Sequence, residues 1–432
     1  MQEIRIGLVG AGTVGGGVVK ILNSRGKLFN SELGAPLVLA RVVDKDERKV
    51  KDLPVGSAVC SSDFSDILED ETISVVVELV GGTTFAKKVV LDSLNRGKHV
   101  VTANKALVAE HGPEIFETAQ KNGVSVYFEA SVGGGMPIIK SVREGLIGND
   151  IVSIKTIING TCNYILTRMT AEGLPFDEVL KEAQARGYAE ADPTLDIGGG
   201  DTAHKVTILA SLVSGGYVPF ENVYCEGITS IRKEDIEFAT ELGYTIKLLG
   251  VIKKSAGSKV EARVHPVMLH ADHILTSVSN EFNAVLLEGD SVGPVLLYGK
   301  GAGEMPTASA VISDIIDTAR NIISGHQVRI PMEYYSSDKE VEIFPVENIS
   351  GRYYLRFTVA DKPGVLADIT KKLGMEKISI ASVMQEEGHA DHSVPVIILT
   401  HTASEKGIRN ALADIEKSNY IRSTTQVIRI ED

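Results

Sequence analysis

A short apolar strand that runs directly into closely spaced glycines constrains the fold of this chain more than any other feature. Residues Ile4–Val9 have the composition of a buried strand, and Gly10-Ala11-Gly12-Thr13-Val14-Gly15 follows with the spacing GxGxxG. Apolar residues at helical spacing come next, and we expect that helix to end at Gly26. Glycines in this context allow a tight turn and let backbone N–H groups approach a pyrophosphate. The pattern predicts a dinucleotide-binding β-α-β unit.

The second strand of this unit carries a candidate for cofactor selection. Residues 36–43 have the composition of a strand that ends at Asp44, about 30 residues after the glycines, so residues 30–34 are interpreted as an inserted loop. A carboxylate at this end binds a ribose 2′-hydroxyl, which favours NAD. The neighbouring cations Lys45 and Arg48 suit the 2′-phosphate of NADP instead, and Asp44 is alternatively just a polar end to the strand. The sequence leaves NAD(H) and NADP(H) open.

Strands and helices then alternate, which is typical of a parallel, doubly wound Rossmann-type sheet. The expected strands lie at 73–80, 99–103 and 124–130, with helices at 85–96 and 114–121. Ligands of such sheets bind beyond the carboxyl ends of the strands. Lys105 follows one of these ends, where it is either part of a site or an ordinary solvated lysine.

The segment Gly187–Lys205 contains four carboxylates, three consecutive glycines and a lysine within 19 residues. It has too few apolar residues to bury a face, so we expect an ordered loop that leads into a helix capped by Asp201. Asp201 and Lys205 stand four residues apart and therefore lie on one face of that helix. Such a pair on its own is commonly an ordinary surface ion pair, but the glycine-rich turns elsewhere in the chain favour a chemical role.

The remaining pattern predicts a multidomain chain of α/β and α+β units. At 432 residues it is too long for one core. We expect a dinucleotide-binding domain at 1–133, completed by a returning segment at 304–345, and a mixed or antiparallel α+β substrate-binding and dimerisation domain at 134–303. Residues 326–350 read as a linker, and the order β-α-β-β-α-β over 350–432 predicts a ferredoxin-like unit.

Composition narrows the partners and the setting. The net charge of −13 argues against nucleic acid and anionic membranes, because both require basic patches. Three scattered cysteines without a CxxC pair indicate neither a disulfide framework nor a zinc site, and Cys162 is expected to be a buried, inert thiol. No signal sequence or apolar run of membrane length occurs, so a reduced cytoplasmic location is expected.

Taken together and in order, several motifs resemble homoserine dehydrogenase with a C-terminal ACT domain. Besides the GxGxxG turn, the motifs that carry the resemblance are Thr102-Ala103-Asn104-Lys105, Glu129-Ala130-Ser131-Val132-Gly133-Gly134-Gly135-Met136-Pro137, Asn159-Gly160-Thr161, Gly187-Tyr188-Ala189-Glu190-Ala191-Asp192-Pro193, Leu195-Asp196, Asp201-Thr202-Ala203-His204-Lys205, Gly301-Ala302-Gly303 and Asp361-Lys362-Pro363-Gly364-Val365-Leu366. Gly134 departs from the alanine that relatives often have, and no basic residue stands directly at the end of the second strand.

The resemblance implies reversible hydride transfer between NAD(P)H and L-aspartate 4-semialdehyde, which yields L-homoserine. Reduction develops negative charge on the aldehyde oxygen, for which Lys205 is the candidate proton donor, positioned by Asp201. Lys105 would orient the substrate and lower the pKa of Lys205 by repulsion. The expected substrate contacts are Glu190, Asp196, Tyr188, Gly160, Thr161 and Lys105. The expected cofactor contacts are Gly10, Gly12, Thr13, Val14, Gly15, Asp44, Gly82, Thr83, Thr102, Lys105 and Gly303.

The resemblance also implies a bound cation and regulation. Backbone carbonyls of Glu129, Val132, Gly134 and Met136 would hold Na⁺ or K⁺. An amino acid, with threonine expected, would bind at the turn containing Asp361, Gly364, Val365 and Leu366, in a homodimer or homotetramer. Three alternatives stay open: an aspartate dehydrogenase, a semialdehyde dehydrogenase that uses Cys162 as nucleophile, and a regulator that senses nucleotide and amino acid without turnover.

Overall fold

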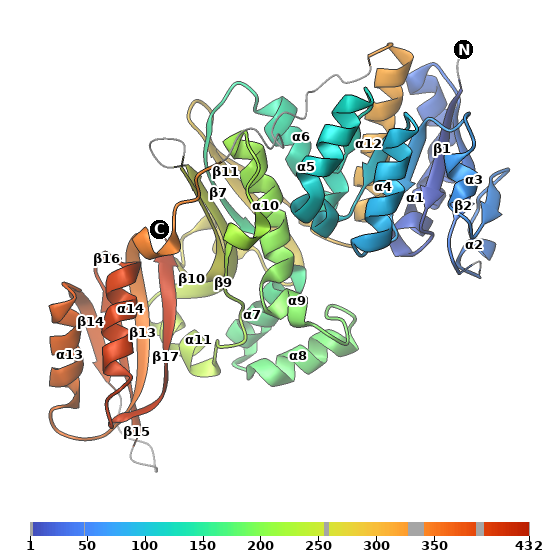
Figure 1. Cartoon of the computed structure of the whole chain (residues 1–432). Coiled ribbons are helices and arrows are strands. Elements are labelled where there is room, and N and C mark those ends of the chain that lie inside the picture. The colour runs from blue at the N-terminus through green and yellow to red at the C-terminus, as the bar shows by residue number, and fades with distance from the viewer. Residues whose placement is uncertain (1–2, 47, 255–258, 327–340, 386–392, 432) are drawn as a thin grey trace.

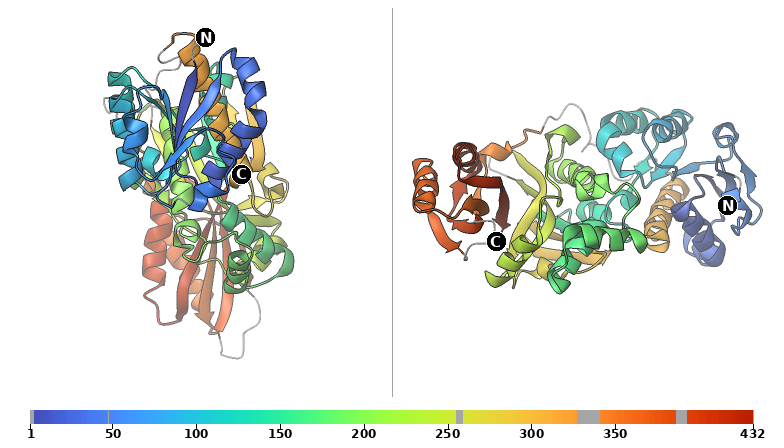
Figure 2. Two further views of the ribbon diagram at one scale, coloured as in Figure 1. Left: turned by 90° about the vertical axis from the view of Figure 1, so that its right-hand side faces the viewer. Right: turned by 90° about the horizontal axis from the view of Figure 1, so that it is seen from below.

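The computed structural model arranges the chain as three parts in a row, with the N-terminal part at one end and the C-terminal part at the other (Figure 1). Views from two further sides place the middle part between them (Figure 2). The structure describes residues 3–46, 48–254, 259–326, 341–385 and 393–431. Among the helices in those ranges, none has the length and apolar character needed to cross a membrane.

The first part is a six-stranded, fully parallel sheet in the order β3-β2-β1-β4-β5-β6, with helices packed around it. This order confirms the predicted doubly wound Rossmann-type fold. Its elements are β1 (Ile4–Val9), α1 (Thr13–Leu33), β2 (Leu37–Val43), α2 (Arg48–Lys51), β3 (Val59–Ser61), α3 (Ser65–Leu68), β4 (Val75–Glu78), α4 (Thr84–Asn95), β5 (His99–Thr102), α5 (Lys105–Lys121), β6 (Val126–Tyr127) and η1 (Glu129–Ser131).

Two helices of this part are longer than the sequence predicted. Helix α1 passes through Gly26 and ends at Gly34, whose φ of +66° is the left-handed conformation of a helix C-terminus. The predicted end at Gly26 and the inserted loop at 30–34 were therefore wrong, because one interior glycine costs only about 1 kcal/mol and burial of Phe29 and Leu33 outweighs it. Helix α5 begins at Lys105 rather than at residue 114.

The middle and C-terminal parts share one continuous sheet. Its main path runs β12-β11-β7-β9-β10-β17-β13-β15-β14, with β8 on β10 and β16 on β13. The elements of the middle part are α6 (Ile138–Lys140), η2 (Ser141–Gly145), β7 (Ile151–Ile157), α7 (Gly160–Glu172), α8 (Phe176–Ala185), α9 (Thr194–Ile197), α10 (Gly200–Ser214), η3 (Phe220–Asn222), β8 (Tyr224–Cys225), α11 (Lys233–Glu241), β9 (Tyr244–Lys254), β10 (Val260–His270), η4 (Ile274–Ser277), β11 (Phe282–Gly289) and β12 (Gly293–Lys300).

Helix α12 (Glu304–Ile323) follows β12 and packs against α1, so the chain returns to the first part as Figure 1 shows. The contact is close, because a Cβ built at Gly17 of α1 would lie 2.9 Å from the Ala308 side chain. The return does not extend to residue 345. Val260 in β10 donates its N–H to the carbonyl of Glu342 and accepts the N–H of Phe344, which places these residues against the middle sheet. Residues 327–340 of the predicted linker lie outside the described ranges.

The C-terminal part has the predicted ferredoxin-like order, with strands β17-β13-β15-β14 side by side. Its elements are η6 (Val346–Asn348), β13 (Ser350–Ala360), α13 (Val365–Met375), β14 (Ile380–Gln385), β15 (Ser393–Thr400), β16 (Ala403–Ser404), α14 (Glu405–Ile415) and β17 (Ile421–Glu431). Strand β17 also pairs in parallel with β10 through Val267, Met268 and Leu269. Backbone hydrogen bonds thus join this unit edge to edge with the middle sheet.

Candidate active site

The start of helix α10 carries Asp201 and Lys205 one turn apart. The residue that caps this helix is Gly199, with φ of +86°, so Asp201 lies in the first turn and the prediction that it caps the helix was wrong. The preceding segment, predicted as a loop, contains the short helix α9. Both side chains are buried, with 6% of Asp201 and 9% of Lys205 exposed. Burial of two opposite charges side by side indicates a built site rather than an ordinary surface ion pair.

The carboxylate of Asp201 lies between the two lysines that were singled out in the sequence. Lys205 Nζ lies 2.7 Å from its Oδ2 atom, and Lys105 Nζ lies 3.2 Å from its Oδ1 atom. Lys105 is the first residue of α5 and comes from the first part, whereas Lys205 comes from the middle part. Residues separated by 100 positions therefore converge on one carboxylate.

The charges around Asp201 keep it ionised. Burial opposes its ionisation, but the positive charges of Lys205 and Lys105 outweigh burial and hold the pKa of Asp201 well below its usual value. Lys205 Nζ also donates to the carbonyl of Ile158 at 2.6 Å. An ammonium has three N–H donors, so one donor of Lys205 is left after these two contacts. That donor suits an oxygen on which negative charge develops.

Asn159 links this pair to the acidic loop. Its amide nitrogen donates to Asp196 Oδ1 at 2.7 Å and to Asp201 Oδ2 at 2.8 Å, while its oxygen caps α7 by accepting the N–H of Cys162. Burial, with repulsion from Asp201, raises the pKa of Asp196. The sequence analysis named Asn159 only within the motif Asn159-Gly160-Thr161, which contributes to the family resemblance. An asparagine at the N-cap of a helix is a local signal, but its contacts with both Asp196 and Asp201 depend on the tertiary fold.

These residues line a cavity of about 670 Å³ between the first two parts of the chain. The predicted site residues that line it are Lys105, Lys205, Asp201, Glu190, Asp196, Tyr188, Gly160, Thr161, Val14, Gly134 and Gly303. The predicted site residues that do not line it are Gly10, Gly12, Thr13, Gly15, Asp44, Gly82, Thr83, Thr102, Glu129, Val132 and Met136. Asn283, Lys300 and Thr307 also line it, although the sequence analysis did not name them as site residues.

The glycine turn after β1 has the geometry that a dinucleotide needs. A Cβ at Gly15 would lie 2.0 Å from the carbonyl of Gly10, whereas nothing lies within 4 Å of a Cβ at Gly12, where α1 begins. The turn is therefore tightly packed on one side and open above the N–H groups of the helix, which fits a pyrophosphate. Asp44 is 8% exposed and accepts the N–H of Ala11 at 2.7 Å and that of Asp46 at 2.9 Å. In this structure Asp44 holds the glycine turn, and its contact with a ribose stays a prediction.

A hydrogen-bonded chain at the ends of β4 and β5 positions Lys105. The hydroxyl of Thr102 donates to buried Glu78 at 2.6 Å and accepts the N–H of Asn104 at 3.0 Å. The Asn104 amide donates to the carbonyl of Gly82 at 2.6 Å, and its oxygen caps α5 by accepting the N–H of Leu107. The sequence analysis missed Glu78, although a carboxylate that ends an apolar strand is a visible signal.

The loop predicted to hold a monovalent cation lines part of the cavity through Ser131, Gly133 and Gly134. The carbonyl of Glu129 accepts the N–H of Val132 at 3.3 Å, and that of Met136 accepts the N–H of Ile138 at 2.9 Å. A carbonyl has two lone pairs, so each retains one for a cation. The Glu129 carboxylate accepts the N–H groups of Ile139 and Lys140, and burial raises its pKa to about 7. The described residues contain no cluster of three or more His, Cys, Asp or Glu side chains suited to a metal.

Two further predictions concern Cys162 and the turn before α13. Burial raises the pKa of Cys162 well above its usual value, and its thiol donates to the carbonyl of Asp196 at 3.2 Å. A thiolate nucleophile is therefore disfavoured at this position. Asp361 and Gly364 are exposed, Leu366 is half-buried and Val365 is buried. These four residues lie in the C-terminal part and line neither the active-site cavity nor the junction cavity described below.

Comparisons with known proteins agree along the whole chain. Family models described as homoserine dehydrogenase, as its NAD binding domain and as an ACT domain match residues 137–316, 10–129 and 353–418. A homoserine dehydrogenase of Neisseria gonorrhoeae is 43% identical over 433 residues, which span 100% of this chain and 99% of the relative. The crystal structure of a homoserine dehydrogenase from Thiobacillus denitrificans matches with a TM-score of 0.94 and 43% identity over 100% of both chains.

A hyperthermophilic archaeal homoserine dehydrogenase in complex with NADPH matches with a TM-score of 0.62 and 28% identity, over 73% of this chain and 97% of that one. The matches to the NAD binding domain, homoserine dehydrogenase and ACT domain models follow one another in the same order as the three parts of the fold. The chain therefore belongs to the homoserine dehydrogenase family of oxidoreductases, which act on a CH–OH group.

Proposed function

We propose that this chain interconverts L-aspartate 4-semialdehyde and L-homoserine with a nicotinamide cofactor. The observation that carries the proposal is the convergence of Lys105 and Lys205 on Asp201, inside a cavity that reaches Val14 of the glycine turn. An aldehyde placed there meets a proton donor beside the cofactor-binding turn. Neither lysine alone supports this reaction as strongly as their shared position does.

The reductive step needs a proton on the aldehyde oxygen and a hydride on the aldehyde carbon. When bound, the nicotinamide supplies the hydride. Lys205 Nζ keeps its contacts with Asp201 and Ile158 and uses its remaining N–H to protonate the developing alkoxide. Asp201 stays ionised and positions Lys205 through the contact of 2.7 Å. Lys105, whose side chain is 34% exposed, orients the substrate from the nucleotide-binding side.

The acidic loop supplies recognition of the amino group. Glu190 and Asp196 both line the cavity, and Thr161 fixes the loop by donating to the carbonyl of Tyr188 at 2.6 Å. A substrate ammonium between these two carboxylates gains charge-assisted hydrogen bonds. The N-terminal turn of α7, at Gly160, lies in the same cavity and suits the substrate carboxylate.

The glycine turn supports NAD(H) or NADP(H) as the cofactor. Gly10, Gly12, Thr13 and Gly15 would hold the pyrophosphate through backbone N–H groups and the start of α1. Thr102, Gly82 and Thr83 stand at the carboxyl ends of the neighbouring strands, and the archaeal relative in complex with NADPH supports the phosphorylated form. We also infer that carbonyls of Glu129, Val132, Gly134 and Met136 bind Na⁺ or K⁺ below the cavity.

The ACT unit and the assembly complete the proposal. We infer working units at 1–133 with 304–323, at 134–303 and at 350–432. Threonine, as the end product of the pathway that homoserine feeds, would bind to the ACT unit and inhibit a cytoplasmic homodimer or homotetramer. The match of an ACT model to residues 353–418 supports an amino-acid effector. Methionine and isoleucine synthesis would draw on the same homoserine.

The experiment that tests this function measures oxidation of NADH and of NADPH by the purified chain with L-aspartate semialdehyde, with and without threonine. Turnover with either cofactor and formation of homoserine are expected. Cys162→Ser serves as the control against an acylating semialdehyde dehydrogenase, and it should retain wild-type turnover because the thiol is buried and protonated. Binding of cofactor without any turnover of the semialdehyde would contradict the proposal.

A further inference from the structure

A second cavity lies at the junction between the ACT unit and the middle part. It has a volume of about 530 Å³. Helix α14 and strand β17 line one side, and residues 224–232, which begin with β8, line the other. It shares no lining residue with the active-site cavity. We call it the junction cavity. The mechanism of hydride transfer makes no use of it.

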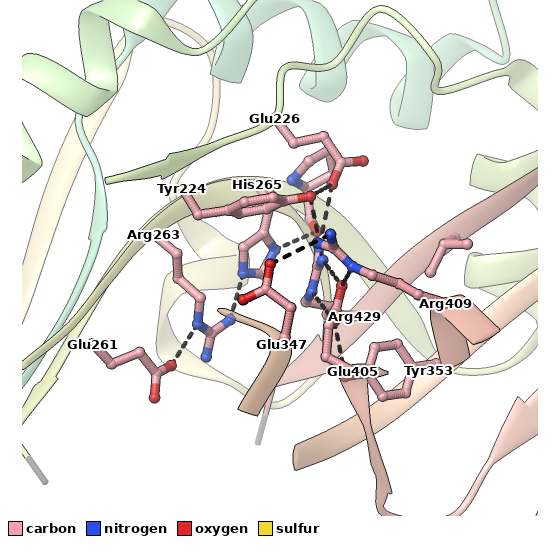
Figure 3. Close-up of polar contacts among 12 residues, drawn as sticks. Tyr224, Glu226, Glu261, Arg263, His265, Glu347, Tyr353, Glu405, Arg409 and Arg429 are labelled. Carbon is pink, nitrogen blue, oxygen red and sulfur yellow. Dashed lines mark hydrogen bonds and ion pairs between the residues drawn. The ribbon is translucent and has the colours of Figure 1, made fainter. Parts of the chain in front are cut away.

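Buried ion pairs fix two walls of the junction cavity, and Figure 3 shows the pairs around Glu405. The Glu405 carboxylate accepts hydrogen bonds from Arg429 Nε at 2.9 Å, from Arg409 Nε at 3.0 Å and from the hydroxyl of Tyr353 at 2.9 Å. Arg356 lies opposite Asp235, with contacts of 2.6 and 2.9 Å. Because Arg356 and Arg429 are committed to these pairs, they form the wall and are not free to bind a ligand.

The groups left for a ligand include one charge of each sign. Arg232 is exposed, and its guanidinium forms no ion pair with any residue in the described ranges. The Glu226 side chain is 30% exposed, and Arg429 and the hydroxyl of Tyr224 both contact its Oε2 atom, at 3.2 and 3.0 Å, so its Oε1 atom is left for a ligand. Thr425 is 8% exposed, and its hydroxyl has no hydrogen-bond partner among the residues that the structure describes.

We propose that the junction cavity binds a small zwitterionic α-amino acid. Arg232 holds its carboxylate, Glu226 holds its ammonium group, and a short side chain packs against the apolar face formed by Ile408, Leu412 and Val427. A phosphate or a nucleotide fits less well, because three of the four lining arginines, Arg356, Arg409 and Arg429, are already paired with carboxylates and only Arg232 would balance its negative charges. A purely apolar ligand would displace water from Arg232 without replacing its hydrogen bonds, and it would leave the Thr425 hydroxyl without a partner. The inference rests on the proposed amino-acid regulation and assigns it a site other than the turn at 361–366.

A short path leads from the junction cavity to the active site. Two residues after Glu226, Ile228 donates its N–H to the carbonyl of Ile197 at 2.8 Å. Between them, a Cβ at Gly227 would lie 2.0 Å from that same carbonyl, so the two segments pack backbone against backbone. Ile197 directly follows Asp196, which lines the active-site cavity. A shift of Glu226 toward a ligand is therefore passed to the proposed ammonium contact, and we expect it to raise the KM for the semialdehyde more than it lowers kcat.

The test measures binding by isothermal titration calorimetry on the full chain, with L-threonine as the first probe and the other proteinogenic amino acids after it. Arg232→Ala removes the carboxylate partner, and Ser230→Trp fills the cavity from an exposed position of its lining. Arg422→Ala is the matched control, since Arg422 is an exposed arginine of the same unit that does not line the cavity. Asp361→Ala reports on the turn before α13.

The proposal expects the dissociation constant to rise at least tenfold in Arg232→Ala and binding to be lost in Ser230→Trp, with both other variants within twofold of wild type. Loss of binding in Asp361→Ala alone overturns it, as does unchanged affinity in both cavity variants. Wild-type protein that turns over the semialdehyde but binds no amino acid also overturns it and leaves the proposed catalytic function standing. If the wild-type protein binds an amino acid, the four variants affect binding as expected, and the wild-type protein shows no turnover, the site is supported and the proposed catalytic function is refuted.

Discussion

Replacement of Lys205 by methionine tests the proton donor directly. Methionine keeps a similar length and removes the ammonium, which contacts Asp201 at 2.7 Å and Ile158 at 2.6 Å. Loss of one positioned general acid lowers the rate by about 10²–10⁴-fold. That range corresponds to roughly 3–5 kcal/mol of lost transition-state stabilisation. The KM for homoserine should change by less than about threefold, because the proposed ammonium contacts Glu190 and Asp196 are intact.

The stability of this variant should fall by less than a broken buried ion pair usually costs. Removing one partner of such a pair costs about 3–5 kcal/mol when the other charge is left alone. Here Asp201 retains Lys105 at 3.2 Å and the amide of Asn159 at 2.8 Å. We therefore expect a loss near or below the lower limit of that range, and a protein that still binds cofactor.

The assay is steady-state oxidation of homoserine, with thermal unfolding measured on the same samples. Lys247→Met is the matched control, because Lys247 is also a buried lysine, 3% exposed, that donates to Asn163 and Val278 but does not line the active-site cavity. It should lower stability and keep kcat within about threefold of wild type. The assignment is refuted if Lys205→Met retains more than a tenth of the wild-type kcat, or if Lys247→Met loses as much activity.

Three further changes probe the cofactor turn, the bridge and the sheet junction. Gly15→Ala places a Cβ 2.0 Å from a carbonyl oxygen and should raise the KM for the cofactor at least tenfold in steady-state assays. Gly26→Ala is its control, because nothing lies within 4 Å of a Cβ at that position. It should leave that KM unchanged and stabilise α1 by about 0.5–1 kcal/mol. Asn159→Ala should cost about 1 kcal/mol as a lost cap in chemical denaturation and raise the KM for homoserine, because Asp196 loses its amide partner. Burial opposes ionisation of Glu431, but Arg263 and Lys253 outweigh it and lower its pKa to about 2. The ionised Glu431 therefore stabilises the fold above pH 4.5, and this contribution is lost as the pH falls toward 2. In Glu431→Gln, the thermal unfolding temperature should fall less steeply between these two pH values.

The first part of the fold was predictable because its signals are local. The GxGxxG turn and the alternation of apolar strands with helices each depend on residues close in sequence. The end of α1 was not predictable in the same way. A glycine at position 26 is a helix stop by local rules, yet Phe29 and Leu33 are buried by tertiary packing, which carried the helix about two turns further.

The charged residues of the site were predictable from the sequence, but the polar contacts that connect them were not. Lys105, Asp201 and Lys205 stand out by type and context, and the structure brings them together. Asn159 joins two carboxylates that are 37 and 42 residues away in sequence, a relation that no local pattern encodes. The pairing of β10 with β17 was equally invisible, because it uses backbone hydrogen bonds over only three residue pairs and leaves no side-chain signature.

The catalytic geometry depends on the packing of two helices from different parts of the chain. Helix α5 and helix α10 meet at the Lys105–Asp201 pair and again where His204 Nε2 lies 3.0 Å from Glu110 Oε1. Lys105 and Glu110 are five residues apart, or about 7.5 Å along α5, so two separated contacts resist sliding of one helix on the other. Of the two lysines, Lys105 is the more exposed and the more distant from Asp201. If the nucleotide-binding part moves away, Asp201 keeps Lys205 and loses Lys105, so the proton donor survives while the group that orients the aldehyde departs.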